Sequence, residues 1–114
     1  MNVDFSCIEN FKTLMRKAMS YASCSHDYVF DPKVDNTVAM AYLNIAVSKF
    51  AAAESLYYSR FDDLQRDEAE DIFRHFDTYT REFLTNIRTD HSHQWTDIEY
   101  QGLKDVFDNS AFGK

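Results

Sequence analysis

Four segments of the chain repeat their hydrophobic residues every three or four positions, which is the spacing of one face of an α-helix. They span residues 5–23, 36–61, 67–89 and 96–109. The clearest pattern lies in 67–89, where apolar residues recur at this spacing from Ala69 to Ile87. The sequence therefore predicts an all-α protein.

The connections between these segments carry their own signals. Residues 24–35 break the periodicity, and Pro32 holds the residue before it out of helical geometry. Asp35 or Asn36 is a suitable N-cap for the following helix. We therefore expect a long loop before residue 36.

The last helix has a start signal of a different kind. Residues 90–95 are mostly polar, and Thr96 is followed three positions later by Glu99. This is the spacing of a capping box, in which the two side chains satisfy each other's free backbone N–H groups. We therefore expect the fourth helix to begin at Thr96.

The segment 36–61 is unusually apolar, since seventeen of the twenty-five residues from 37 to 61 are hydrophobic. A helix that exposes one side to solvent needs fewer apolar residues. This segment is therefore predicted to be a central helix that the rest of the chain covers on several sides. The expected architecture is a compact, antiparallel four-helix bundle in which residues 1–114 form a single domain.

A stripe of small residues runs along this predicted central helix. Its members are Thr37, Ala41, Asn44, Ser48, Ala52, Ser55 and Ser59. Such a stripe favours close approach of another backbone, which could belong to the same chain, to a second copy or to a foreign protein. If the contact is internal, bulky residues at Ser48 or Ala52 should cost about 1–3 kcal/mol. If it is intermolecular, Ser48, Ala52 and Ser55 are candidate partner-binding residues.

The charge of the chain indicates which partners to expect. Its formal net charge is −7; residues 62–114 hold thirteen acidic and six basic side chains, whereas residues 1–61 hold six of each. An acidic protein repels nucleic acid and anionic membranes, so we expect a protein partner with a basic surface. The candidate acidic residues are Asp67, Glu68, Glu70, Asp71 and Asp77.

Two interpretations of these acids remain open. Acids in the first turn of a helix stabilise its dipole, which accounts for many of them without any partner. Alternatively, the acids imitate a phosphate backbone and block a nucleic-acid-binding enzyme, as an anti-CRISPR-like inhibitor from a virus or mobile element would. Trp95 is a further candidate contact, because tryptophan is frequent at interface hot spots.

Few residues suggest catalysis or a cofactor. Asp90, His91 and His93 are potential ligands for a divalent metal, but polar residues of this kind also cap helix ends. Residues 24–27, Cys-Ser-His-Asp, have the types needed for nucleophilic catalysis, yet adjacent side chains point in different directions. With two glycines in the whole chain, a phosphate-binding loop is excluded. We therefore expect a non-enzymatic protein that binds another protein without a cofactor.

The two cysteines and the length of the apolar runs suggest a compartment. If Cys7 and Cys24 lie on one continuous helix, the seventeen positions between them span about 25 Å, which is too far for a disulfide. Unpaired thiols are typical of the reducing cytoplasm. No apolar run approaches the ~20 residues that a membrane-spanning helix needs.

Overall fold

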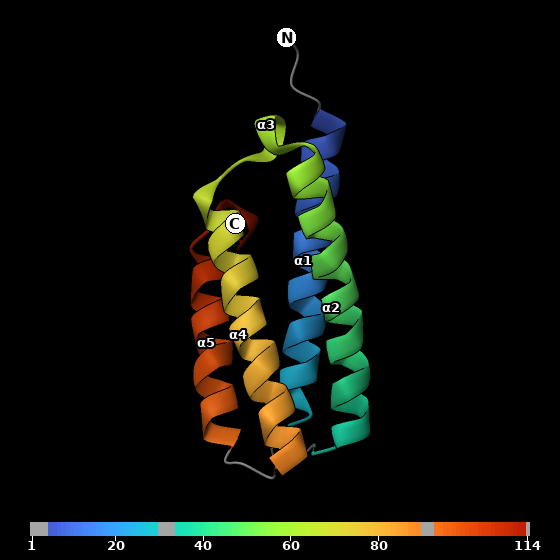
Figure 1. The fold of residues 1–114 in the computed structure, drawn as a ribbon, viewed down its shortest axis with the longest axis vertical. Coiled ribbons are helices and arrows are strands. Elements are labelled where there is room, and N and C mark those ends of the chain that lie inside the picture. Colours follow the sequence, from blue (N-terminus) through green and yellow to red (C-terminus); the bar gives the residue numbers. More distant parts are fainter. Residues whose placement is uncertain (1–4, 30–33, 90–92, 114) are drawn as a thin grey trace.

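The computed structural model describes residues 5–29, 34–89 and 93–113, and most of them are helical (Figure 1). The four long helices are α1 (Phe5–Asp27), α2 (Asn36–Ser59), α4 (Asp67–Thr89) and α5 (His93–Asp108). A short helix, α3 (Phe61–Leu64), lies between α2 and α4, and a 3-10 turn, η1 (Ala111–Gly113), follows α5. The prediction of an all-α fold is confirmed.

The long helices form an antiparallel bundle in which each helix runs opposite to the next one along the chain (Figure 1). α1 packs closely on α2, and α4 packs closely on α5, whereas the two pairs lie farther apart from each other. The molecule is therefore two helical hairpins packed face to face, as expected for an antiparallel bundle.

Side-chain size explains why α1 and α2 pack closely while the two hairpins lie farther apart. On the closely packed pair, Ala18 of α1 and Ala39, Ala46 and Ala53 of α2 are completely buried. Alanine lets two helix backbones approach, because it places only a methyl group between them.

Between the two hairpins, the space is filled by aromatic rings. The ring of Phe50 on α2 lies 4.2 Å from that of Phe76 and 6.4 Å from that of Phe73, both on α4. Phe11 of α1 packs edge-on against Phe73 of α4, with the ring centroids 6.4 Å apart. Rings of this size keep the hairpins apart and form the core.

α1 ends four residues later than the sequence predicts, at Asp27 instead of residue 23. Ser25 is fully buried, and its Oγ donates to the carbonyl oxygen of Ala22 at 2.6 Å. The ring of His26 stacks on Tyr100 of α5, with the centroids 4.0 Å apart. These contacts extend the helix through residues of weak intrinsic helix propensity.

α2 begins as predicted, because the Asp35 side chain accepts a hydrogen bond from the Val38 N–H at 3.1 Å and caps the helix. The helix ends at Ser59, two residues earlier than predicted, and Phe61 opens the separate helix α3.

The expectation that α2 is covered on several sides is wrong. Its buried residues form one stripe with alternating spacings of four and three: Ala39, Leu43, Ala46, Phe50, Ala53 and Tyr57. The neighbouring helices α1 and α4 contact α2 through this stripe. The opposite side of α2 therefore faces outward. Many of the apolar residues counted in the sequence are alanines, which tolerate either environment.

α5 begins three residues before the predicted start, so Thr96 is not its N-cap. Thr96 lies inside the helix, fully buried, and its hydroxyl donates to the carbonyl oxygen of Glu82 on α4 at 3.4 Å. Asp97 and Glu99 consequently lie beyond the first turn and do not stabilise the helix start. The predicted capping box is therefore wrong, because the threonine serves a tertiary contact instead.

None of the helices in the described ranges is both long enough and apolar enough to cross a lipid bilayer.

Candidate functional site

The outward side of α2 is the first candidate site. Every member of the small-residue stripe, Ser48, Ala52 and Ser55 included, is exposed. At 100° per residue, three large apolar side chains flank this stripe: Ile45 is 38% exposed, Val47 40% and Tyr58 58%. We call the stripe together with these three residues the α2 outer face.

The α2 outer face carries no charge. The sequence of α2 contains one basic and one acidic residue, Lys49 and Glu54, and both are half-buried at the edges of the face. Burial raises the pKa of Glu54, and the neighbouring Asp77 of α4 raises it further. A solvated helix surface on an acidic protein usually carries charged residues, so this face differs from an ordinary solvated surface.

The small-residue stripe is therefore not an internal contact. No helix within the part of the chain that the structure describes packs against it, so the interpretation that it meets another of these helices is wrong. In the structure this face is exposed to solvent.

The predicted acidic surface is partly used by the fold itself. Glu70 accepts a hydrogen bond from the Tyr57 hydroxyl at 2.7 Å, and that hydroxyl in turn accepts one from the Arg66 N–H at 3.1 Å. Burial and the Glu70 hydrogen bond raise the pKa of Tyr57 to about 12. Glu68 accepts a hydrogen bond from the Ala111 N–H at 2.8 Å. Glu68 and Glu70 therefore tie α4 to α2 and to η1.

The other predicted acids stay at the surface. Asp67 and Asp77 are exposed, and Asp71 forms an ion pair with Arg74. Arg74, Arg81 and Arg88 are all exposed on α4 as well. The surface of this helix therefore carries both signs of charge, with the acids concentrated toward its beginning.

Trp95 is exposed, as expected for a candidate contact residue. Its exposed fraction is 52%, and that of Ile98, which lies three positions further along α5, is 48%. The two side chains share one side of the helix, since residues three apart are neighbours on a helical surface.

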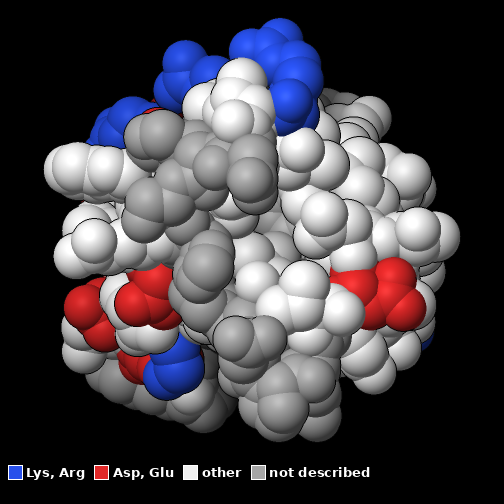
Figure 2. Space-filling view, turned by 90° about the horizontal axis from the view of Figure 1, so that it is seen from below, with Lys and Arg blue, Asp and Glu red and all other residues white. Residues whose placement is uncertain are grey.

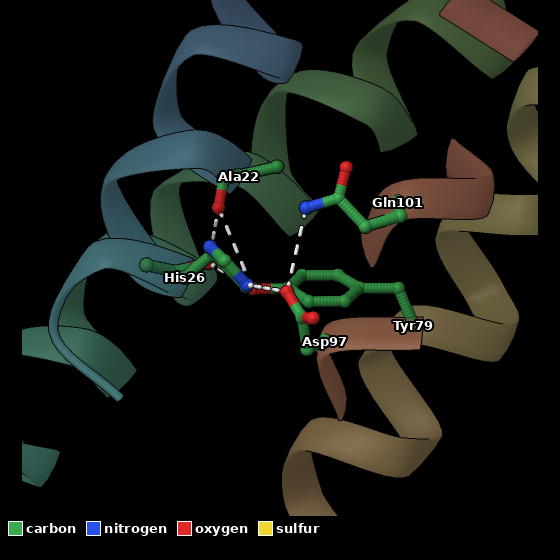
Figure 3. Close-up of polar contacts among 6 residues, drawn as sticks. Ala22, His26, Tyr79, Asp97 and Gln101 are labelled. Carbon is green, nitrogen blue, oxygen red and sulfur yellow. Dashed lines mark hydrogen bonds and ion pairs between the residues drawn. The ribbon is translucent and has the colours of Figure 1, made fainter. Parts of the chain in front are cut away.

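The sequence did not indicate a polar cluster that joins α1, α4 and α5 (Figure 3). His26 of α1 contacts the carboxylate of Asp97 on α5, with Nε2 3.0 Å from Oδ1, and Gln101 donates to the same carboxylate oxygen at 3.4 Å. The Tyr79 hydroxyl of α4 is hydrogen-bonded to Ser25 Oγ at 2.7 Å. Burial raises the pKa of Tyr79 far above its usual value, so this hydroxyl stays neutral.

This cluster does not form a nucleophilic site. Ser25 is completely buried, and its hydroxyl is engaged by Ala22 and Tyr79. An activated serine has to reach a substrate and contact a base. The bond between Ser25 and Tyr79 therefore satisfies two polar groups inside the bundle, which are costly when left unpaired, whereas Asp97 and Gln101 lie at its surface.

Of the predicted metal ligands, Asp90 and His91 lie outside the described residues. His93 opens α5, but its side chain is also outside the described part. Among the side chains that are described, no group of three or more His, Cys, Asp and Glu is placed to hold a metal ion.

His26 should make the stability of the protein depend on pH. Burial lowers its pKa below the ordinary 6.5, although the hydrogen bond and the charge of Asp97 act in the opposite direction. Below pH 6.5 the unfolded chain therefore binds this proton more readily than the folded one, and the free energy of unfolding falls as the pH drops toward the folded pKa.

We expect His26→Gln to flatten this dependence. The measurement is urea unfolding of both proteins between about pH 5.5 and 7.5, where unperturbed carboxylates stay ionised. If the wild type and the variant have parallel pH profiles, another group is responsible.

No protein-family model matches the chain, and comparisons with curated proteins and with solved structures find no match.

Proposed function

We propose that this protein is a non-enzymatic binding module that forms a stoichiometric complex with another polypeptide. The observation that carries this proposal is the α2 outer face, an uncharged surface along a long helix in a chain of net charge −7. Exposed apolar patches on soluble proteins commonly mark sites of protein interaction.

The shape and chemistry of this face suit a helical partner. Ser48, Ala52 and Ser55 are small enough to let another backbone come close, while Ile45 and Tyr58 supply apolar area at the side. Aromatic residues such as Tyr58 contribute strongly to binding when a partner buries them. The acids Asp67, Asp71 and Asp77 lie on α4, where they would favour a partner with basic residues beside its apolar contact surface.

A matched pair of variants tests this proposal. Ala52→Glu places one negative charge in the middle of the α2 outer face, and Thr13→Glu places the same charge on an exposed position of α1. Both positions are solvent-accessible in a helix, so both variants should fold with unchanged circular dichroism and nearly unchanged melting temperature.

The readouts are the mass in solution by light scattering and the proteins retained by the tagged chain from an extract of its source organism. We expect the wild type and Thr13→Glu to form a complex of defined stoichiometry, and Ala52→Glu to lose it. If the complex contains only this chain, the partner is a second copy. Retention of the complex by Ala52→Glu, or a wild type that stays monomeric and captures nothing in stoichiometric amount, contradicts the proposal.

A further inference from the structure

A second surface feature, separate from the α2 outer face, lies where α2 begins and α4 ends. There the structure has a shallow groove lined by Met40 of α2 and by Leu84, Thr85 and Ile87 of α4, with Arg81 and Arg88 as its charged residues. Leu84 is 43% exposed, whereas Met40 and Ile87 are partly buried against the core. The groove therefore offers apolar area that solvent can reach.

The two arginines give this groove a chemical preference. Arg81 and Arg88 are exposed, and neither forms an ion pair with the described acids, even though Asp77 lies one helical turn before Arg81. Seen from this end of the molecule, Lys and Arg side chains gather along one edge (Figure 2). Two arginines that form no ion pair with the described acids, on a chain of net charge −7, favour a negatively charged ligand at this place.

The spacing of these residues defines the ligand more closely. Arg81 and Arg88 are seven positions apart, which is about 10.5 Å along the axis of α4, and Leu84 lies between them. Two carboxylates at the same separation on another helix can each meet one guanidinium. An aliphatic side chain between those carboxylates would then pack on Leu84.

We propose that this groove binds an acidic amphipathic helix of a partner protein, with carboxylates on Arg81 and Arg88 and an aliphatic residue against Leu84. Nucleic acid and anionic membranes are disfavoured as ligands. Their extended phosphate surfaces would also meet the acidic residues elsewhere on the molecule, which outnumber the basic ones. The proposal is independent of the α2 outer face and can fail without affecting that site.

The test uses synthetic helical peptides and the isotope-labelled full chain. The main probe carries two glutamates seven residues apart with leucines between them. One comparison peptide replaces the glutamates by lysines, and another replaces the leucines by serines. Binding is followed by chemical-shift changes of the backbone amides and by fluorescence anisotropy.

We expect the glutamate–leucine peptide to shift amides around Leu84 and Met40, and both comparison peptides to bind at least about fivefold more weakly. Arg81→Glu and Arg88→Glu should each weaken binding by about fivefold, because each reversal removes an attraction and adds a repulsion. Leu84→Ser should weaken it without changing the charge. Added salt should weaken it as well.

Arg74→Glu is the matched control, since Arg74 is the exposed arginine seven positions before Arg81 but is paired with Asp71 outside the groove. It should change the affinity by less than about twofold. An equal effect of Arg74→Glu, or equal binding of the serine peptide, would overturn the proposal by showing that only diffuse charge attracts the ligand. Tighter binding to phosphatidylserine vesicles or single-stranded DNA than to the glutamate–leucine peptide would also overturn it.

Discussion

Replacement of Phe50 by alanine is expected to lower the free energy of unfolding by about 3–5 kcal/mol. Phe50 is 1% exposed, and its ring contacts two rings of α4 in the layer that separates the two hairpins. Truncation leaves a cavity that Phe73 and Phe76 cannot fill without moving the hairpins together. Urea unfolding monitored by circular dichroism measures the loss.

Tyr58→Ala is the control for this experiment. Tyr58 is also an aromatic residue of α2, but 58% of it is exposed. Its removal should cost about 1 kcal/mol or less, because little buried area is lost. A similar loss of stability in both variants would show that Phe50 does not lie in the core between the hairpins.

The sequence predicts the parts of this fold in which the pattern is local and strong. The helix predicted over residues 67–89 matches α4 at both ends, because its apolar residues follow helical spacing and polar residues fill the other side. The N-cap at Asp35 is likewise a local interaction between a side chain and a nearby N–H. Such features need no knowledge of distant segments.

The errors arise where a distant residue decides the local structure. In the sequence, Ser25 belongs to a segment that is typical of a loop. In the structure, its hydroxyl is hydrogen-bonded to Tyr79, fifty-four positions away. Thr96 has the residue type and spacing of a helix cap, but in the structure its hydroxyl donates a hydrogen bond to the Glu82 carbonyl. These partners come together only after the helices have packed, so periodicity and capping rules cannot anticipate them.

The candidate site shows the same division. The sequence identifies the small-residue stripe and Trp95 as candidate contacts, but not that Glu68 and Glu70 form hydrogen bonds with other parts of the protein. Acidic residues at a helix start look alike in sequence, whether they face a partner, the helix dipole or a tyrosine hydroxyl. Only the positions of Tyr57 and Ala111 distinguish the acids that bond to other helices from those that stay at the surface of α4.

Adjacent alanines on α2 provide the sharpest test of which side of this helix is covered. Ala53 is completely buried in the closely packed pair of α1 and α2, whereas Ala52 belongs to the exposed α2 outer face. Ala53→Leu should therefore lower the free energy of unfolding by about 1–3 kcal/mol, because the larger side chain pushes the two backbones apart. Ala52→Leu should change it by no more than about 0.5 kcal/mol.

The two substitutions are chemically identical and both keep a good helix former, so helix propensity cancels in the comparison. From the sequence alone, the internal interpretation of the stripe predicted the large cost at Ala52. If thermal and urea unfolding place the larger loss at Ala52, α2 is rotated about its axis relative to this structure, and the α2 outer face is a core contact. If the larger loss is at Ala53, the uncharged side of α2 faces solvent and is available to a partner.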